Sequence, residues 1–342
     1  MSEFKVNTIT NKDGNHGQQV CGITTFGSSG VTLPNGPTEF RGGNGSGGER
    51  GRGLFAGGET PRLNVIDKIE ISTTGNATDF GDLVETATNI GGAGNQIRGL
   101  FFAGETPSLV NTIQYVTMSS QGGSNHFGDL SYGKIGHNGA VANSTRAITA
   151  GGYTDPGYSS KIEFVTIAST GDADNFGDLL IPKYAMGSFS SPTRGVFGGA
   201  DPGTSPNTTD DIEFIEIATL GNSQDFGDLI TPRLNAGGAA SQTRGLVMGG
   251  RDIPSGGTDN AEYVTIASKG NAILFGSLIG SSSKCTAVSN SIRGVEGGGG
   301  TSANDMCYVH ISTLGTAVDF GDLTTSRASL GSACDAHGGL AQ

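Results

Sequence analysis

The sequence predicts an all-β protein, a six-bladed β-propeller preceded by an extended arm. The tetrapeptide Phe-Gly-Asp-Leu, once as Phe-Gly-Ser-Leu, recurs at intervals of 45 to 50 residues, beginning at Phe80, Phe127, Phe176, Phe226, Phe275 and Phe320. An arginine opens a short run that ends in small residues six times, at Arg52, Arg98, Arg146, Arg194, Arg244 and Arg293. Repeats of this period, built from strands alone, are typical of propeller blades.

Each repeat contains four short strands in a fixed order. The arginine-led strand is followed by a variable loop and by an alternating segment such as 162–169 (IEFVTIAS), whose period of two is that of a strand. A glycine such as Gly171, five residues before each repeated phenylalanine, indicates a tight turn. The Phe-Gly-Asp-Leu strand and a small-residue strand such as 234–241 (LNAGGAAS) complete the unit. We find no helical period.

The two ends of the sequence predict how the ring closes. After Phe320 one further small-residue segment follows, with no blade of its own, and the sequence before Arg52 (FRGGNGSGGERG) makes a poor strand. We therefore expect the segment around Ala328–Ala336 to complete the first blade, which leaves no open sheet edge. The propeller is then expected over residues 48–342. Residues 1–47 do not repeat, and we expect an extended attachment arm that packs beneath the propeller or adds a strand to a partner.

Residues that recur once per blade are expected to be architectural. The repeated phenylalanines are predicted to fill the core between blades. The aspartates of the tetrapeptide are expected either to cap turns or to pair with the repeated arginines. Because the fifth repeat has Ser277 at this position, the pairing hypothesis predicts that Arg244 lacks such a partner.

Recognition is expected where the repeats differ. Length variation is concentrated in the loop between the arginine-led strand and the alternating strand, and these loops should emerge on one face of the disc. The alternative is that they are ordinary solvent loops. The candidate binding residues in these loops are Arg62, Asp155, Tyr158, Asp201, Asp210, Arg251, Asp252 and Asp259.

Composition and motifs disfavour several other functions. A net charge of −12 disfavours a nucleic-acid partner, and no apolar stretch is long enough to span a membrane. The five histidines share no metal-ligand spacing, and no phosphate-binding motif occurs. We therefore expect no catalytic residue, cofactor or metal. A pair of carboxylates for glycoside hydrolysis stays open, because their separation is a three-dimensional quantity.

Two resemblances add expectations about function. From Arg52 onward the chain resembles the kelch-repeat family in its Gly-Gly strand ends and aromatic four-strand layout, although it has no tryptophan and phenylalanine takes that place. Over its full length it is similar to virion structural proteins of tailed bacteriophages, especially those of marine cyanobacteria. That similarity lies in the opening VNTITNKDG…VCGITTF…GVTLPNGPTEFRGG and in the repeated YVTIAST-G…FGDL.

The phage resemblance implies a non-enzymatic virion protein that is assembled in the host cytoplasm. Its arm would bind other virion proteins of a tail fibre or baseplate, and its exposed face would contact a host-surface glycan or protein. The alternatives are a capsid decoration protein, a cellular kelch-type adaptor, and a carbohydrate-active or oxidase-type propeller enzyme.

Overall fold

The computed structural model describes residues 51–59, 61–137, 139–253, 255–300 and 304–336, together with two short strands near the N-terminus. Contacts divide the chain into Met1–Gly47 and Gly48–Gln342. In the first unit, β1 (Thr25–Gly27) pairs with β2 (Gly30–Thr32) in an antiparallel ladder. The rest of the predicted attachment arm lies outside the described residues.

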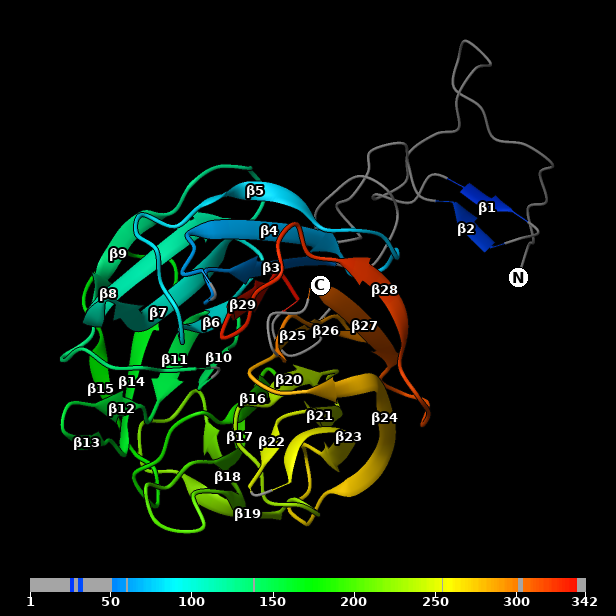
Figure 1. Cartoon of the computed structure of the whole chain (residues 1–342). Helices are drawn as coiled ribbons and strands as arrows, with labels where there is room; N and C mark the ends of the chain where they lie inside the picture. The colour runs from blue at the N-terminus through cyan, green and yellow to red at the C-terminus, as the bar shows by residue number, and fades with distance from the viewer. Residues whose placement is uncertain are drawn as a thin grey trace, which may run out of the picture. The chain divides into compact units, whose positions relative to one another are not determined.

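The second unit is a six-bladed β-propeller, which confirms the predicted fold class (Figure 1). Each blade is an antiparallel sheet, and the blades follow one another around a ring in chain order. Blade 1 contains β3 (Arg52–Ala56), β4 (Val65–Glu70) and β5 (Thr78–Asp82); blade 2 contains β6 (Gly91–Gly94), β7 (Arg98–Thr106), β8 (Ser108–Thr117) and β9 (Asn125–Asp129); blade 3 contains β10 (Ala140–Ala142), β11 (Arg146–Ala150), β14 (Lys161–Thr166) and β15 (Asp174–Asp178). Blade 4 contains β16 (Gly187–Ser190), β17 (Arg194–Ala200), β18 (Thr209–Glu216) and β19 (Gln224–Asp228); blade 5 contains β20 (Gly237–Ala240), β21 (Arg244–Met248), β22 (Arg251–Asp252), β23 (Gly256–Thr265) and β24 (Ile273–Ser282); blade 6 contains β25 (Thr286–Ser289), β26 (Arg293–Gly297), β27 (Asp305–His310) and β28 (Val318–Asp322).

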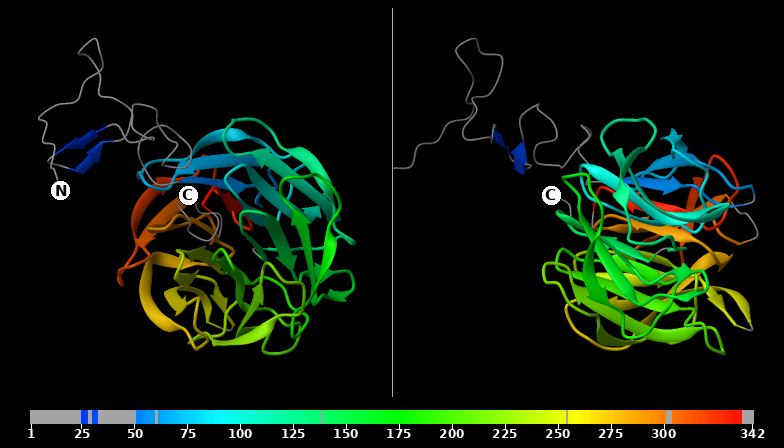
Figure 2. Two further views of the ribbon diagram at one scale, coloured as in Figure 1. Left: turned by 180° about the vertical axis from the view of Figure 1, so that it is seen from behind. Right: turned by 90° about the vertical axis from the view of Figure 1, so that its left-hand side faces the viewer.

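The last strand of the chain closes the ring, as the sequence predicts (Figure 2). Strand β29 (Gly331–Cys334) pairs antiparallel with β3, from Gly331 opposite Ala56 to Cys334 opposite Gly53. Blade 1 therefore takes its inner strand from the C-terminal end and its other three strands from the N-terminal end of the propeller.

Phenylalanines of the repeated tetrapeptide lie in the cores between blades. Their exposed fractions are between 1% and 3%. Each belongs to an apolar cluster that spans two neighbouring blades: Phe127 of β9, for example, shares its cluster with Ala147 and Val165 of blade 3. Burial of aromatic surface at every junction thus joins the blades into one ring.

The glycine of the tetrapeptide is required by the close approach of the next blade. Gly81 has a φ of 148°, and a Cβ on it would lie 2.4 Å from the carbonyl of Gly122. The Gly122 N–H in turn donates to the carbonyl oxygen of Phe80 at 2.9 Å. A side chain at this position would push the two blades apart.

The repeated arginines form a second set of contacts between blades. Arg98 Nη1 of blade 2 donates to the Ile167 carbonyl of blade 3 at 2.7 Å, and Arg244 Nη1 of blade 5 donates to the Ile311 carbonyl of blade 6 at 2.8 Å. The other four make the same contact with the following blade: Arg52 with Met118, Arg146 with Ile217, Arg194 with Ile266 and Arg293 with Ile71.

An aromatic ring lies beneath most of these arginines. The Arg98 guanidinium is 4.6 Å from the centre of the Tyr115 ring, and that ring packs edge-on against Phe127. Arg146, Arg194, Arg244 and Arg293 stack in the same way on Phe164, Phe214, Tyr263 and Tyr308. Blade 1 has Lys68 at the equivalent position, and there Arg52 lies 3.6 Å from Glu70 instead.

The hypothesis that the tetrapeptide aspartates pair with these arginines is wrong. Arg244 makes the same carbonyl contact as the other arginines, although its blade carries Ser277 in place of the aspartate. The residue at the aspartate position instead contacts the next blade through its backbone: the Asp178 N–H donates a hydrogen bond to Asn222 Oδ1 at 3.0 Å.

Candidate functional site

The variable loops emerge on a common face of the disc, because all blades share one antiparallel strand order around one ring. We call this the loop face, made of the loops that follow β3, β7, β11, β17, β21 and β26 and the segments that lead into each blade. In five blades an isolated bridge fixes the loop to the incoming segment, as between Tyr184 and Asp201 or between Ile135 and Tyr153. These loops are therefore fastened to the scaffold.

The predicted binding residues are spread around the loop face rather than gathered at one point. Arg62 in blade 1 forms an ion pair with Glu105 of blade 2 at 2.9 Å. Arg251, Asp252 and Asp259 lie on β22 and β23 of blade 5. Asp155, Tyr158 and Asp201 lie in the loops of blades 3 and 4, and two of these three meet.

A tyrosine cluster forms the most distinctive feature of this face. The Tyr158 ring centre lies 5.6 Å from that of Tyr153 and 5.5 Å from that of Tyr184. Tyr153 and Tyr158 come from the short hairpin of β12 (Tyr153–Thr154) and β13 (Gly157–Tyr158), and Tyr184 comes from the segment that leads into blade 4. Two blades thus contribute to one aromatic surface, in which all three rings are partly exposed.

One carboxylate borders the tyrosine cluster. Asp201 accepts a hydrogen bond from the Gly203 N–H at 2.7 Å, and it raises the pKa of both Tyr158 and Tyr184 after burial, which is the larger cause. The pKa of Tyr184 reaches about 12. These hydroxyls therefore keep their protons at neutral pH and can act as hydrogen-bond donors. Gly203 is required here, because a Cβ on it would lie 2.5 Å from the Tyr158 ring.

Beside the cluster lies a surface cavity of about 700 Å³. Tyr158 and Asp155 line it together with Tyr132, whose hydroxyl is 2.5 Å from Ser159 Oγ. Burial raises the pKa of Tyr132 to about 12. The Lys161 ammonium lies 5.5 Å from the centre of the Tyr132 ring. The site thus combines apolar ring faces, neutral hydroxyls and a few charges. Such a combination suits a ligand that carries many hydroxyl groups or both apolar and polar surface.

Sequence reasoning missed Tyr132, Tyr153 and Tyr184, although a signal for them exists. The chain has seven tyrosines, and three of them, Tyr115, Tyr263 and Tyr308, occupy the repeated position beneath an arginine. The other four all belong to the tyrosine cluster and its cavity: Tyr132, Tyr153, Tyr158 and Tyr184. Removing the repeat positions from the tyrosine list would have pointed to this site.

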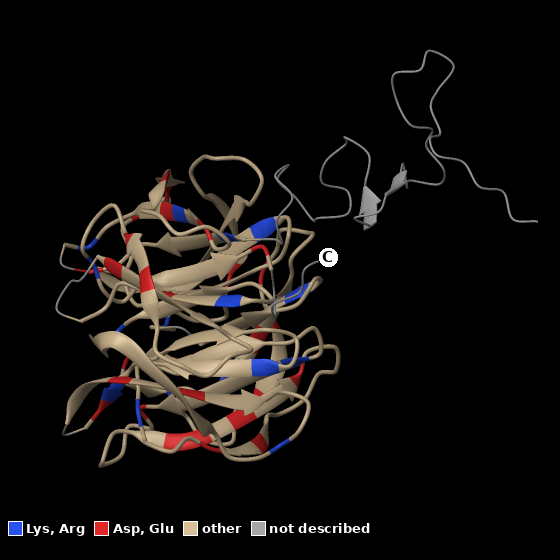
Figure 3. Ribbon diagram, turned by 90° about the vertical axis from the view of Figure 1, so that its right-hand side faces the viewer, with Lys and Arg blue, Asp and Glu red and all other residues tan. Residues whose placement is uncertain are grey.

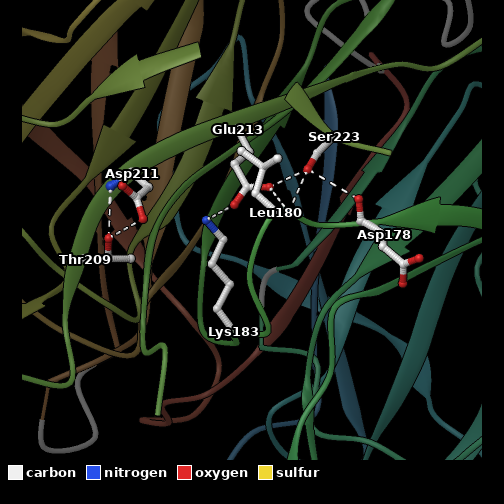
Figure 4. A network of polar contacts seen from close by, with 7 residues as sticks. All are labelled: Asp178, Leu180, Lys183, Thr209, Asp211, Glu213 and Ser223. Carbon is white, nitrogen blue, oxygen red and sulfur yellow. Dashed lines mark hydrogen bonds and ion pairs between the residues drawn. The ribbon is translucent and has the colours of Figure 1, made fainter. Parts of the chain in front are cut away.

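Buried charges elsewhere in the propeller form ion pairs across blade junctions (Figure 4). The Lys183 ammonium lies 2.6 Å from the Glu213 carboxylate, which also accepts hydrogen bonds from the Ser223 hydroxyl and from the Leu180 N–H. Three further junctions have the same arrangement: Lys134 with Glu163 at 3.9 Å, Arg327 with Asp67 at 2.9 Å, and Arg233 with Glu262. We call these four pairs the ionic row; their side chains are at most 2% exposed.

Acidic and basic residues both occur in many parts of the propeller ribbon (Figure 3). Within the described ranges, one group has metal-ligand geometry: the carboxylates of Asp210, Asp211 and Asp228 lie within 4.8 Å of one another. Asp211 also accepts a hydrogen bond from the Thr209 hydroxyl at 2.7 Å. No helix in the described part of the chain is long and apolar enough to cross a membrane.

No protein-family model matches the chain, and no curated protein matches it.

Proposed function

We propose that this chain is a non-enzymatic binding protein, a propeller displayed on a phage particle and attached to its tail fibre or baseplate by residues 1–47. Its loop face contacts the host surface, and the tyrosine cluster forms the centre of that contact. The partner we favour is a surface glycan, because tyrosine rings pack on the apolar faces of sugars while the hydroxyls bond to sugar oxygens.

The observation that carries the binding role is the position of the tyrosine cluster. Tyr153, Tyr158 and Tyr184 come from two blades, have no tyrosine counterpart in the other blades, and are partly exposed, so blade packing does not account for their side chains. Tyrosine offers a large, stiff contact surface at a low entropy cost. A ring of six blades holds the loops that carry it, and multiple copies on one particle would strengthen weak single contacts.

A scaffold role for the buried charges supports a protein without catalysis. The eight residues of the ionic row are paired with each other across blade junctions, where they hold neighbouring blades together. Charged groups placed in this way are engaged in packing instead of facing a substrate. The tyrosine hydroxyls, whose pKa values are raised, are donors for binding and poor nucleophiles at neutral pH.

Binding is tested with purified protein and the host cell or its extracted surface polysaccharide. We expect Tyr158→Ala to weaken binding by about tenfold or more, which is the loss of one aromatic anchor. Leu220→Ala is the control, since it removes an exposed side chain from the turn between β18 and β19, at the other end of β18 from the loop face, and should leave binding unchanged. Equal binding by the Tyr158 variant and the parent protein would remove the tyrosine cluster from the proposal.

Placement on a particle is tested by cryo-electron microscopy of a virion that encodes this chain. We expect a six-bladed disc with its loop face outward and residues 1–47 among neighbouring tail proteins. A disc on the capsid shell would favour a capsid decoration protein. A particle without the disc, together with a free monomer in solution, would refute the virion role and leave the binding experiment as an independent result.

A further inference from the structure

The junction between blades 5 and 6 breaks the charge pattern of the ionic row. At the four junctions of the ionic row, a Lys or Arg lies seven residues after one tetrapeptide phenylalanine. It pairs with an Asp or Glu that lies thirteen residues before the tetrapeptide phenylalanine of the next blade. At the 5–6 junction these two positions hold Ser282 and Cys307. The basic residue is therefore missing from this junction.

The junction of blades 1 and 2 likewise lacks both the base and the acid. It carries Ala87 and Gln114 at the two positions. Gln114 Oε1 accepts hydrogen bonds from the Val84 N–H and the Ser124 hydroxyl, both at 2.8 Å. These are the same two contacts that Glu213 accepts from Leu180 and Ser223 at the 3–4 junction. A neutral pair thus replaces an ion pair without leaving a charge behind.

At the 5–6 junction the acid position is also neutral, but a carboxylate stands on the neighbouring strand, at a position where no other blade carries one. Glu296 of β26 lies opposite Cys307 of β27 in the ladder and is 4% exposed. The Ser282 hydroxyl donates to Glu296 Oε1 at 2.6 Å, and Cys307 Sγ lies 3.4 Å from Oε2. Among the described residues, no Lys or Arg forms an ion pair with it. Burial raises the pKa of Glu296 to about 7, as expected of a carboxylate without a counter-charge.

A cavity of about 370 Å³ opens against Glu296. Ser282, Met306 and Cys307 line its inner part, and the exposed Asp305 and Asp319 lie in its wall nearer the surface. Its volume is roughly that of a dozen water molecules, ample for a ligand of several heavy atoms. Every ionisable residue that lines the cavity is an acid or a thiol.

We propose that this cavity binds an organic cation, a primary ammonium or guanidinium group, which occupies the position of the missing basic residue and pairs with Glu296. A buried carboxylate gains most from a partner that carries a full positive charge and several N–H donors. The acids at the wall favour entry of a cation over an anion. This site lies in a blade junction and does not depend on the proposed virion role.

The test uses n-butylammonium, which has the length and charge of a lysine side chain, with 1-butanol as its uncharged analogue. We expect titration calorimetry of the full chain to detect n-butylammonium at millimolar or tighter affinity and not to detect 1-butanol. Glu296→Gln keeps the shape and should weaken binding by about tenfold or more. Asp79→Asn is the charge-matched control: Asp79 holds in blade 1 the repeat position of Asp319, and its loss should change nothing.

A second variant, Ser282→Lys, adds a positive charge to the cavity instead of removing the negative charge of Glu296. It restores the basic residue that Lys134 and Lys183 supply at their junctions, so its own ammonium should fill the cavity and abolish n-butylammonium binding while the fold is kept. This outcome separates the proposal from a general loss of folding. Binding of n-butylammonium that is unchanged in Glu296→Gln or in Ser282→Lys, or no binding to the parent protein, would overturn the proposal.

Proton release gives an additional readout that a general surface site would not show. Glu296 has a raised pKa, and the groups facing it are Ser282, the thiols of Cys285 and Cys307, whose pKa values are also raised by burial, and Asp305. A bound cation lowers the pKa of Glu296, so binding at about pH 6 should release up to one proton and binding at about pH 9 should release none. Glu296→Gln should release none at either pH.

Discussion

At the scale of single residues, the blade junctions of this propeller differ in how their buried polar side chains are balanced. Glu213 is balanced by Lys183, Gln114 needs no counter-charge, and Glu296 has hydrogen bonds but no base. Removing one partner of a buried pair leaves an uncompensated charge, whereas replacing both is often nearly neutral. Lys183 with Glu213 and Ala87 with Gln114 occupy equivalent positions, so the second junction can serve as a template for the first.

Lys183→Ala should destabilise the propeller, because it leaves Glu213 charged and buried. We expect a loss of about 3–5 kcal/mol in the free energy of unfolding, measured by urea denaturation. The double variant Lys183→Ala with Glu213→Gln copies the Ala87–Gln114 junction, and it should recover most of this loss. A double variant as unstable as the single one would mean that the ion pair itself, rather than the balance of charge, stabilises the junction.

The candidate site shows which residues a repeat analysis finds and which it misses. Tyr158 and Asp201 lie in loops of variable length, so the sequence alone marked them. Tyr184 lies in the segment leading into blade 4 and Tyr153 at the start of a hairpin, and only the folding of two blades brings them together. The ionic row was missed for a similar reason: its partners belong to different blades, and neither position stands out within one repeat.

At the scale of strands and blades, the repeat predicted the architecture well, because its period and alternation follow from local geometry. The sequence alone predicts the number of blades, the four-stranded sheets and the tight turn at each glycine. The partners of the repeated arginines are not visible, since a backbone carbonyl such as that of Ile167 has no signature in the sequence. The aspartates of the tetrapeptide were one of the partners considered from the sequence, and among the described residues none of them forms an ion pair with a repeated arginine.

Blade 1 offers a direct test of the aromatic contact beneath the arginine. It carries Lys68 where five blades have Tyr or Phe, so Arg52 has no ring to stack on. We expect Lys68→Tyr to stabilise the propeller by about 0.5–1 kcal/mol, since it supplies a cation–π contact at a partly buried site. Thermal unfolding measures the gain. Lys68→Leu is the control, because it adds apolar surface without a ring; an equal gain from both would assign the effect to burial instead of stacking.

At the scale of the whole molecule, a propeller persists as a closed ring because every blade packs on two neighbours. Blade 1 alone depends on strands from both ends of the propeller, and β29 is the single element that joins them in one sheet. Ala333 and Leu330 bury their side chains in the clusters on either side of this blade. Without β29 the edge of β3 would expose unpaired backbone groups, which can pair with another chain.

Two truncations that differ by this one strand test the closure. A chain ending at Leu330 loses β29, whereas a chain ending at Ala336 keeps it. We expect the shorter chain to unfold at a temperature lower by about 10 °C or more and to associate through the free edge of β3, while the longer one behaves as the full protein does. Calorimetry and light scattering measure the two effects. The reason is the path of the chain. The other five sheets each come from one continuous stretch of chain, so removal of the C-terminal strand leaves them intact and opens the first blade alone. A shorter chain that stays monomeric with an unchanged midpoint would show that packing between blades is sufficient to hold blade 1 without its inner strand.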